Sequence, residues 1–218
     1  MTEAVPSRLE RRKARTRAAL IEAAAAFIAA GKTNAPILEI TQAADVGMGS
    51  FYNHFESKEQ LFQAAVEHGL EVYGNLLDQL TADLTDPAHV FAQSFRLTGR
   101  LHRRQRELSK VLLSNGLAMA ASDKGIASFV LRDIEDAVRA GRFSARDPKL
   151  ALVVVAGAAL CLGQLLHDHP EQDDAEATDQ VTEDLLRMFG LSADEAHEIC
   201  RLPLPGLGTV VELPDSAA

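Results

Sequence analysis

Three side chains near residue 50 are of the types that hold phosphate. Tyr52 and His54 carry a phenol O–H and an imidazole N–H, and Lys58 adds a positive charge. Each can bond a phosphate oxygen, and such contacts set the register of a protein on a nucleic acid without reading its sequence. Gly49, just before them, has no side chain, so the backbone can approach a ligand closely there. This spacing favours nucleic-acid binding.

These residues lie in a pattern typical of a helix-turn-helix. A helix is expected over about 36–44, because Pro36 suits a first helical turn. Residues 45–47 form a turn that contains glycine, and a further short helix is expected over 48–54. In such a unit the second helix lies in the DNA major groove and reads base edges with its first residues. Here the first residues are Met48, Gly49 and Ser50.

The aromatic residues of the second helix divide between an inner and an outer face. Phe51 and Phe55 are four residues apart, so both are expected to pack inward on the helix over 36–44. Tyr52 and His54 then project from other faces. Each feature alone would be ordinary core or an ordinary turn, but the spacing, the turn and the nearby charge together indicate DNA binding.

The N-terminus is basic. Within residues 8–17 six residues are Lys or Arg and one is acidic. Residues 1–14 are expected to form a flexible arm, followed by a helix over 15–30. Three arginines could enter the minor groove or contact phosphates, or could instead belong to a solvated tail. These arginines are Arg11, Arg12 and Arg15.

Composition and charge restrict the remaining possibilities. The 218 residues are 47% hydrophobic and show no alternating strand pattern, which predicts an all-α fold. The net charge of −9 divides into +1 for residues 1–60 and −10 for the remainder, a basic end on an acidic body. Cys161 and Cys200 give no disulfide framework and fit a reducing cytoplasm. The uncharged run over 150–166 is marginal as a membrane span, so we expect a buried helix and no membrane partner.

The segment RTRAALIEAAAAFIAAGK…PILEITQAADVGMGSFYNHFESKEQLF resembles the N-terminal DNA-binding domain of TetR-family transcriptional regulators. The likeness runs from about residue 16 to 66 and is strongest in FYNHFESKEQLF. It implies that Tyr52, His54 and Lys58 contact DNA phosphates and that residues 48–50 read bases.

The chain departs from the family pattern at four positions. Gly47 stands where Ser or Thr is common, and Thr41 where Ala is usual. Leu38 stands where Arg is common, and Met48 replaces a basic or small polar residue. Because Met48 cannot donate a hydrogen bond to guanine, we expect an apolar contact such as one with a thymine methyl group.

The resemblance implies an N-terminal three-helix DNA-binding domain and a larger C-terminal helical domain. We place the basic flexible arm at 1–14, the helix-turn-helix domain at 15–60, the effector-binding and dimerisation domain at 61–202 and a flexible tail at 203–218. A long helix opens at Ser57, where SKEQ fits a capping box. Further helices are expected over about 87–114, 122–140, 148–167 and 175–189.

The helices over 148–167 and 175–189 are the expected dimer element. A palindromic double-stranded operator requires a two-fold protein, which indicates a homodimer. Four small residues of the first helix would let backbones approach: Ala156, Gly157, Ala159 and Gly163. The alternative is a central helix in a monomeric bundle.

The resemblance also implies a pocket for a small-molecule effector that the sequence does not identify. Candidate lining residues, each equally able to be plain core, are Phe91, Phe95, Leu112, Met119 and Phe129. An anionic effector such as a coenzyme A thioester could instead lie on Arg100, Arg103 and Arg104, although a solvated face is the simpler interpretation.

No catalytic motif is visible, so we expect neither an enzyme nor a cofactor. His167 and His169 are two residues apart and do not share a helix face, so a helix terminus explains them better than a metal site. The expected function is a ligand-released repressor. The alternative is a helix-turn-helix protein controlled by a protein partner. An enclosed apolar cavity on the order of a few hundred cubic ångströms would favour the former.

Overall fold

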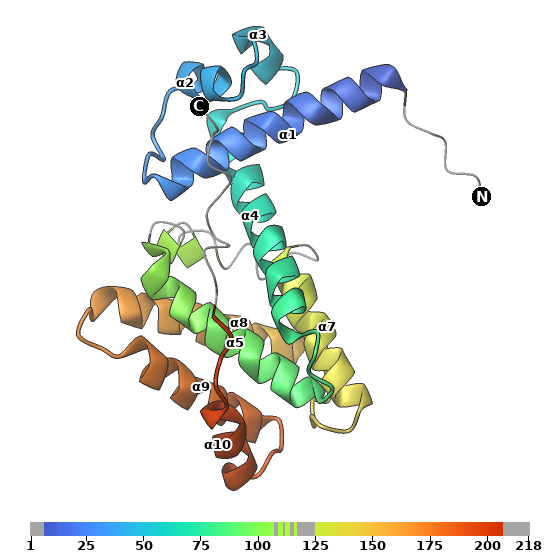
Figure 1. The fold of residues 1–218 in the computed structure, drawn as a ribbon, viewed down its shortest axis with the longest axis vertical. Coiled ribbons are helices and arrows are strands. Elements are labelled where there is room, and N and C mark those ends of the chain that lie inside the picture. The colour runs from blue at the N-terminus through green and yellow to red at the C-terminus, as the bar shows by residue number, and fades with distance from the viewer. Residues whose placement is uncertain (1–6, 107–108, 111, 114–115, 117–124, 207–218) are drawn as a thin grey trace. The chain divides into compact units, whose positions relative to one another are not determined.

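The computed structural model describes residues 7–106, 109–110, 112–113, 116 and 125–206 (Figure 1). Every regular element in these residues is a helix, which confirms the predicted all-α class. The chain divides into two units, Met1–Gly69 and Leu70–Ala218. The division falls inside helix α4 (Lys58–Thr81), later than the predicted boundary after residue 60.

The first unit contains helices α1 (Arg8–Ala29), α2 (Ile37–Ala43) and α3 (Met48–Phe51), and the start of α4. Apolar residues at helical spacing meet in its core, and Phe51 and Phe55 both face inward as predicted. The buried residues of this core include Leu20, Ala24, Ile28, Ile40, Phe51, Phe55 and Leu61.

The prediction of a flexible arm over residues 1–14 was wrong for its second half. Helix α1 begins at Arg8, where Ser7 and Glu10 form a capping box. Ser7 Oγ accepts from the Glu10 amide at 3.2 Å, and the Ser7 amide donates to Glu10 Oε2 at 2.6 Å. Because two otherwise unpaired amides are satisfied, the helix starts at Arg8, the first of the basic residues, rather than at residue 15.

The turn before α3 and the cap at the start of α4 largely follow the prediction. Helix α3 stops at Phe51, short of the predicted end at 54, and the chain continues in tight turns to Phe55. At the start of α4, Ser57 Oγ accepts from the Gln60 amide at 3.2 Å. The Gln60 side chain accepts from the Glu56 amide rather than from Ser57, so the capping box is shifted by one residue on that side.

The second unit contains the remainder of α4 and the helices α5 (Pro87–Arg104), α7 (Ile126–Arg139), α8 (Pro148–Asp168), α9 (Asp174–Met188) and α10 (Ala193–Arg201). Helix α5 ends at Arg104 and not near 114, because Gln105 leaves helical geometry at φ −125°. Helix α10 was not predicted, although Ser192 caps it by accepting from the Glu195 amide at 3.2 Å.

Three phenylalanines from distant parts of the chain form the centre of the second core. Phe143 and Phe189 stack with ring centroids 4.5 Å apart, and Phe91 meets both edge-on at 5.3 and 5.6 Å. Such pairs stabilise the fold by about 0.5–1.5 kcal/mol beyond the effect of the apolar area that they bury. Helices α5, α9 and the segment between α7 and α8 are thereby joined.

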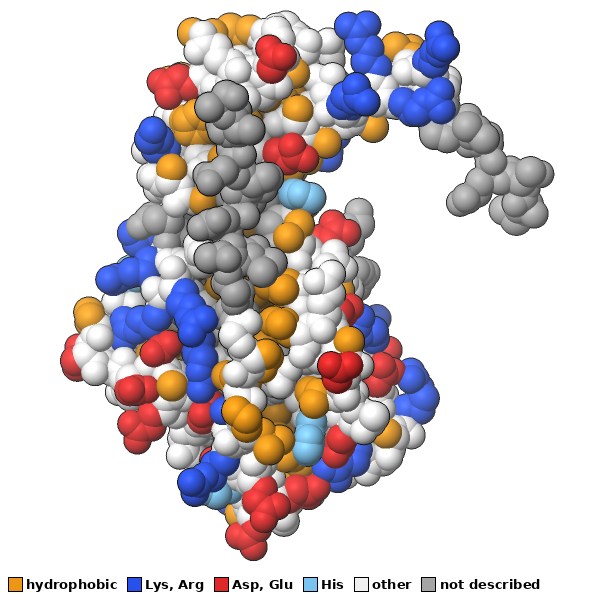
Figure 2. Space-filling model, in the orientation of Figure 1, with side chains coloured by type: hydrophobic (Ala, Val, Ile, Leu, Met, Phe, Trp, Pro, Cys, Tyr) orange, Lys and Arg blue, Asp and Glu red, His pale blue; other side chains and the backbone are white. Residues whose placement is uncertain are grey.

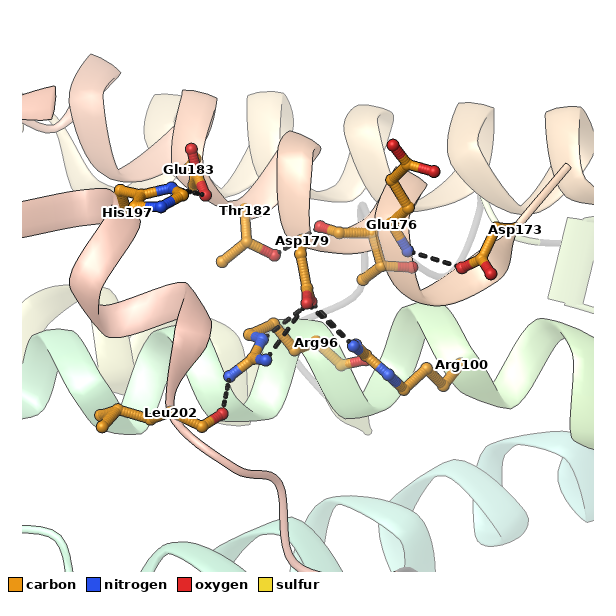
Figure 3. A network of polar contacts seen from close by, with 10 residues as sticks. Arg96, Arg100, Asp173, Glu176, Asp179, Thr182, Glu183, His197 and Leu202 are labelled. Carbon is orange, nitrogen blue, oxygen red and sulfur yellow. Dashed lines mark hydrogen bonds and ion pairs between the residues drawn. The ribbon is translucent and has the colours of Figure 1, made fainter. Parts of the chain in front are cut away.

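A buried arginine fastens α5 to α9 (Figure 3). Arg96 donates to Asp179 from Nε at 2.8 Å and from Nη2 at 3.2 Å, and from Nη1 to the Leu202 carbonyl at 2.8 Å. Arg100 adds two further bonds to the same carboxylate at 2.9 and 3.1 Å. These bonds lie within the chain and hold the end of α10 as well as α9.

The structure contradicts an anionic effector on Arg100 and Arg103. Arg100 is occupied by Asp179, and Arg103 Nη2 donates to the carbonyls of His169 and Gln172 at 2.7 and 2.9 Å. Only Arg104 of the three remains an exposed side chain. Arg103 thus stabilises the turn after α8, and His169 is the C-cap of that helix, as the helix-terminus interpretation predicted.

Gly99 lets α5 and α9 pack closely. A Cβ at this position would lie 2.3 Å from both Cγ2 and Oγ1 of the fully buried Thr178. We expect Gly99→Ala to lower the free energy of unfolding by about 1–3 kcal/mol, as overpacking does, measured by urea denaturation. The double variant Gly99→Ala/Thr178→Ala should recover much of the loss. Equal losses in single and double variants would contradict this packing account.

Candidate nucleic-acid interface and apolar cavity

The outer face of the first unit carries the residues predicted to contact DNA. Tyr52 is 62% exposed and Met48 is 47% exposed, while Gly49 is open and Ser50 is partly buried. His54 and Lys58 are partly buried, with Lys58 Nζ 6.0 Å from the centroid of the Phe62 ring. All six residues therefore lie within one short segment whose inner side is anchored by Phe51 and Phe55. That they contact DNA stays a prediction.

Neither glycine at the start of α3 is required by the protein itself. A Cβ at Gly47 or at Gly49 would meet no atom within 4 Å. Among the described residues, positive φ angles occur at other glycines, so the backbone does not require glycine at these two positions. A helix interior also disfavours glycine relative to alanine. Gly47 is the N-cap of α3, a position where glycine is accepted, so of the two only Gly49 has no explanation within the described protein.

The basic residues of α1 divide between two faces of the helix. Arg8, Arg11, Arg12 and Arg15 follow one another at spacings of three, one and three, and so share a face. Lys and Arg side chains gather over this N-terminal end of α1 in Figure 2. The predicted residues Arg11, Arg12 and Arg15 are therefore helical and exposed, rather than part of an extended arm.

Lys13 and Arg17 belong to the other face of α1 and were missed by the sequence analysis. Arg17 Cζ lies 5.0 Å from the centroid of the Phe55 ring, a cation–π contact beside His54. Partial burial, then the charges of Lys13 and Arg17, lower the pKa of His54. Among the residues described here, no carboxylate lies within ion-pair distance of Lys13 or Arg17. The signal that could have found them is their i,i+4 spacing.

The second unit contains a partly open apolar cavity of about 130 Å³, smaller than the enclosed cavity expected for an effector. Its walls come from four helices, α4, α5, α7 and α8, together with Leu112 and Gly116. Of the predicted lining residues, four border this cavity, namely Phe91, Phe95, Leu112 and Phe129, while Met119 lies outside the described residues. Whether they contact an effector stays a prediction.

One part of the cavity wall is acidic. Asp78 of α4 and Asp133 of α7 both line it. Arg132 pairs with both from outside, through Nη2 at 2.6 Å to Asp78 and 2.8 Å to Asp133. Burial raises the pKa of Asp133, against the opposing effect of Arg132. A buried carboxyl at an apolar cavity favours a ligand that donates a hydrogen bond and disfavours an anion.

Tyr73, Ser94, Thr98 and His102 supply further polar groups of the wall. Tyr73 Oη lies 3.4 Å from Thr98 Oγ1, and burial raises the pKa of Tyr73 to about 12. His102 Nδ1 lies 2.8 Å from Ser109 Oγ, and burial lowers the pKa of His102. Both groups remain uncharged near neutral pH. The cavity therefore fits a small, neutral, hydroxylated molecule.

The small residues predicted to serve a dimer interface have different roles. A Cβ at Gly163 would lie 2.4 Å from His102 Cε1 of the same chain, so this glycine makes room for His102. Ala156 and Ala159 line the cavity. At Gly157, in contrast to Gly163, a Cβ would meet no atom within 4 Å. Three of the four therefore face their own chain.

Helix α8 carries an exposed apolar stripe on the side away from the cavity. Leu150 and Val153 are 65% and 64% exposed. The stripe continues at helical spacing through Val154, Gly157, Cys161 and Leu165. By length and composition α8 would also suit a membrane, although core helices of soluble proteins meet the same criterion. An exposed apolar stripe of this length indicates a protein interface.

Family models of the same group of proteins match both units of the chain. The family model described as "Bacterial regulatory proteins, tetR family" matches residues 20–65, and that described as "Tetracyclin repressor-like, C-terminal domain" matches residues 86–202. No curated protein sequence gave a significant match.

Solved structures align with most of the chain, across both units. RolR in complex with resorcinol is 33% identical over 90% of this chain and 98% of RolR, with a TM-score of 0.71. RolR without ligand aligns over 87% of this chain and 99% of its own, again at 33% identity, with a TM-score of 0.67. A TetR-family regulator from Shewanella shares the fold at 16% identity, covering 81% of this chain and 99% of its own, with a TM-score of 0.61.

Proposed function

This chain belongs to the TetR family of transcriptional regulators, and from that premise we propose that it is a homodimeric repressor released from its operator by a small neutral effector. The family places a DNA-binding helix-turn-helix in the first unit. The apolar cavity of about 130 Å³ in the second unit is the observation that carries the effector part of the proposal. A solid core there would have favoured control by a protein partner.

On the operator, we assign phosphate contacts to Tyr52, His54 and Lys58 and base reading to residues 48–50. The exposure of Met48 and the open approach to Gly49 support this assignment. Leu38, 49% exposed, is a second large apolar side chain on the helix-turn-helix. Met48 would contact an apolar group such as a thymine methyl, and the basic face of α1 would contact the flanking backbone.

The effector fits the cavity as one small ring with hydroxyl groups. A cavity on the order of 150 Å³ is known to hold benzene, and this one is of similar size at about 130 Å³. Asp78 and Asp133 would accept hydrogen bonds from hydroxyls, while their charge would reject carboxylates. RolR, which is similar over nearly the whole chain, was solved with resorcinol, and resorcinol is therefore the first probe. The effector can act only through a difference in its affinity for the DNA-binding and released states.

The dimer is assigned to the stripe of α8 together with α9. A second copy of this chain would cover Leu150, Val153, Gly157 and Cys161, and two-fold symmetry would match a palindromic site. The membrane alternative for α8 leaves its cavity-lining side unexplained.

The thiol of Cys161 reports on this dimer. We expect it to react slowly with a disulfide reagent at concentrations where sedimentation gives twice the chain mass of 23.5 kDa. Val153→Asp should give a monomer and a fast thiol, because a charge is then placed in the apolar contact. Cys200 serves as an unreactive reference, since burial raises its pKa to about 12. Val72→Asp, at another exposed apolar position, is the control. Fast reaction of Cys161 in an intact dimer would place the interface elsewhere.

The regulator proposal is tested by selecting random duplex DNA with the purified protein, with and without resorcinol. We expect a two-fold-symmetric sequence, a steep loss of affinity with salt and release by resorcinol but not by benzoate. Absence of any enriched sequence, also after unfolding and refolding to remove a bound ligand, would overturn the regulator. Enrichment with no release by small hydroxylated aromatics would instead favour a protein partner.

A further inference from the structure

We propose that Lys13 and Arg17 of α1 close a phosphate site around His54, and that DNA binding takes up a proton at this histidine. The proposal rests on the function proposed above and adds two contact residues and a pH dependence to it. The ligand is a phosphodiester of the DNA backbone.

Lys13 and Arg17 lie on the side of α1 that meets Phe55, the residue after His54. Lys13 and Arg17 are four residues apart and so share a face of α1. Arg17 lies over the Phe55 ring at 5.0 Å, and Phe55 follows His54 directly. The capping box at Ser7 and Glu10 makes this part of α1 helical, so both cations are held on that face rather than on a flexible arm.

Among the described residues the site is positive, and no carboxylate forms an ion pair with it. His54 is partly buried and faces Lys13 and Arg17 from α1. On its own segment the neighbouring titratable groups are Tyr52, Glu56 and Lys58. Within the described part of the chain, neither Glu56 nor another carboxylate pairs with Lys13, Arg17 or His54. Three donors without an acid are therefore arranged to receive an anion.

The direction of the proton linkage follows from these charges. In the free protein burial and the two cations lower the pKa of His54, so it is mostly neutral at pH 7. A phosphate between the three groups offsets the cations and favours the charged imidazole, which raises that pKa. Between the two values the DNA complex holds more protons than the free protein, so affinity rises as pH falls.

The experiment measures binding of the selected operator and of an unrelated duplex by fluorescence anisotropy at pH 5.5 to 8, at constant ionic strength. We expect up to about tenfold tighter binding per pH unit for each half-site, the limit for one proton, in both duplexes. His54→Gln should flatten the profile. Lys13→Ala and Arg17→Ala should each reduce the salt slope by about one for each half-site. Lys32→Ala, beyond the other end of α1, is the matched control and should change neither the pH profile nor the salt slope.

A second readout needs no DNA. We expect the pKa of the His54 imidazole, followed by NMR, to rise towards its ordinary range in Lys13→Ala and Arg17→Ala but not in Lys32→Ala. A wild-type pH slope in His54→Gln would overturn the proton uptake. Salt slopes and His54 titrations unchanged in the two α1 variants would overturn the site. A pH slope present on all duplexes with no preferred sequence would count against the regulator alone, because a phosphate contact is independent of sequence.

Discussion

Gly49→Ala is expected to weaken operator binding by about 10- to 100-fold, corresponding to the 1–3 kcal/mol of a lost base contact. A Cβ at this position meets no atom of the protein within 4 Å, so the only collision it can make is with a bound molecule. In the proposed complex α3 lies in the major groove, so that molecule would be the DNA. The loss is measured as the change in Kd for the selected operator.

The same substitution is expected to stabilise the protein. Alanine is favoured over glycine in a helix by about 1 kcal/mol at most, so the unfolding midpoint of the first unit should rise. A variant that is more stable and yet binds DNA less tightly separates function from folding.

Gly69→Ala is the matched control for this prediction. Gly69 is also helical, and a Cβ there would likewise meet nothing within 4 Å. The control should raise stability by a similar amount and leave the operator Kd unchanged. If Gly49→Ala binds the operator as tightly as the control does, the proposed close approach of α3 to DNA is contradicted.

Asp133→Leu is expected to abolish the response to resorcinol while leaving operator binding without effector intact. Loss of a hydrogen bond to a charged acceptor costs about 1.5–3 kcal/mol, which corresponds to roughly 10- to 100-fold in effector affinity. The measurement is isothermal titration with resorcinol, followed by operator release in anisotropy.

Stability and pH give two internal checks on Asp133. Its pKa is raised by burial, so between its unfolded and folded values the folded state binds the extra proton and stability falls as pH rises through that range. Asp133→Leu removes this cost, so the variant should fold at least as stably at neutral pH. Resorcinol affinity of the wild type should in turn weaken when Asp133 is protonated at low pH, because the carboxyl is then a poorer acceptor.

Asp136→Leu is the control for Asp133, because Asp136 is an exposed carboxylate on the same helix and pairs with Arg139. It should change neither effector affinity nor release. Undiminished resorcinol binding in Asp133→Leu would show that the acidic wall of the cavity does not hold the effector.

The features that could be predicted from the sequence were those set by residues close together in the chain. The turn at 45–47, the inward phase of Phe51 and Phe55 and the cap at Ser57 all depend on residues within four positions of one another. The early start of α1 was missed although Ser7 and Glu10 carry the same kind of local signal.

The roles of single polar residues in the second unit could not be predicted in this way. Asp133 lies among the apolar positions of α7, three residues after Val130 and one before Ile134, and a carboxylate on an apolar face is a signal that the sequence prediction did not use. Arg100 and Arg103 looked like a free basic face because their partners, Asp179 and the carbonyls of His169 and Gln172, lie more than sixty residues away.

The sequence by itself determined the helical class, the helix-turn-helix and the family, since each depends on periodicity, capping and short motifs that act over one or two helical turns. Only the tertiary structure decided that Gly163 accommodates His102 while Gly157 stays open, and that four helices leave a cavity with Asp78 and Asp133 in its wall. The physical reason is that such features depend on side-chain volumes and directions contributed by segments far apart in the chain. A one-dimensional pattern indicates which face of a helix is buried, but not which neighbour fills it or where space remains.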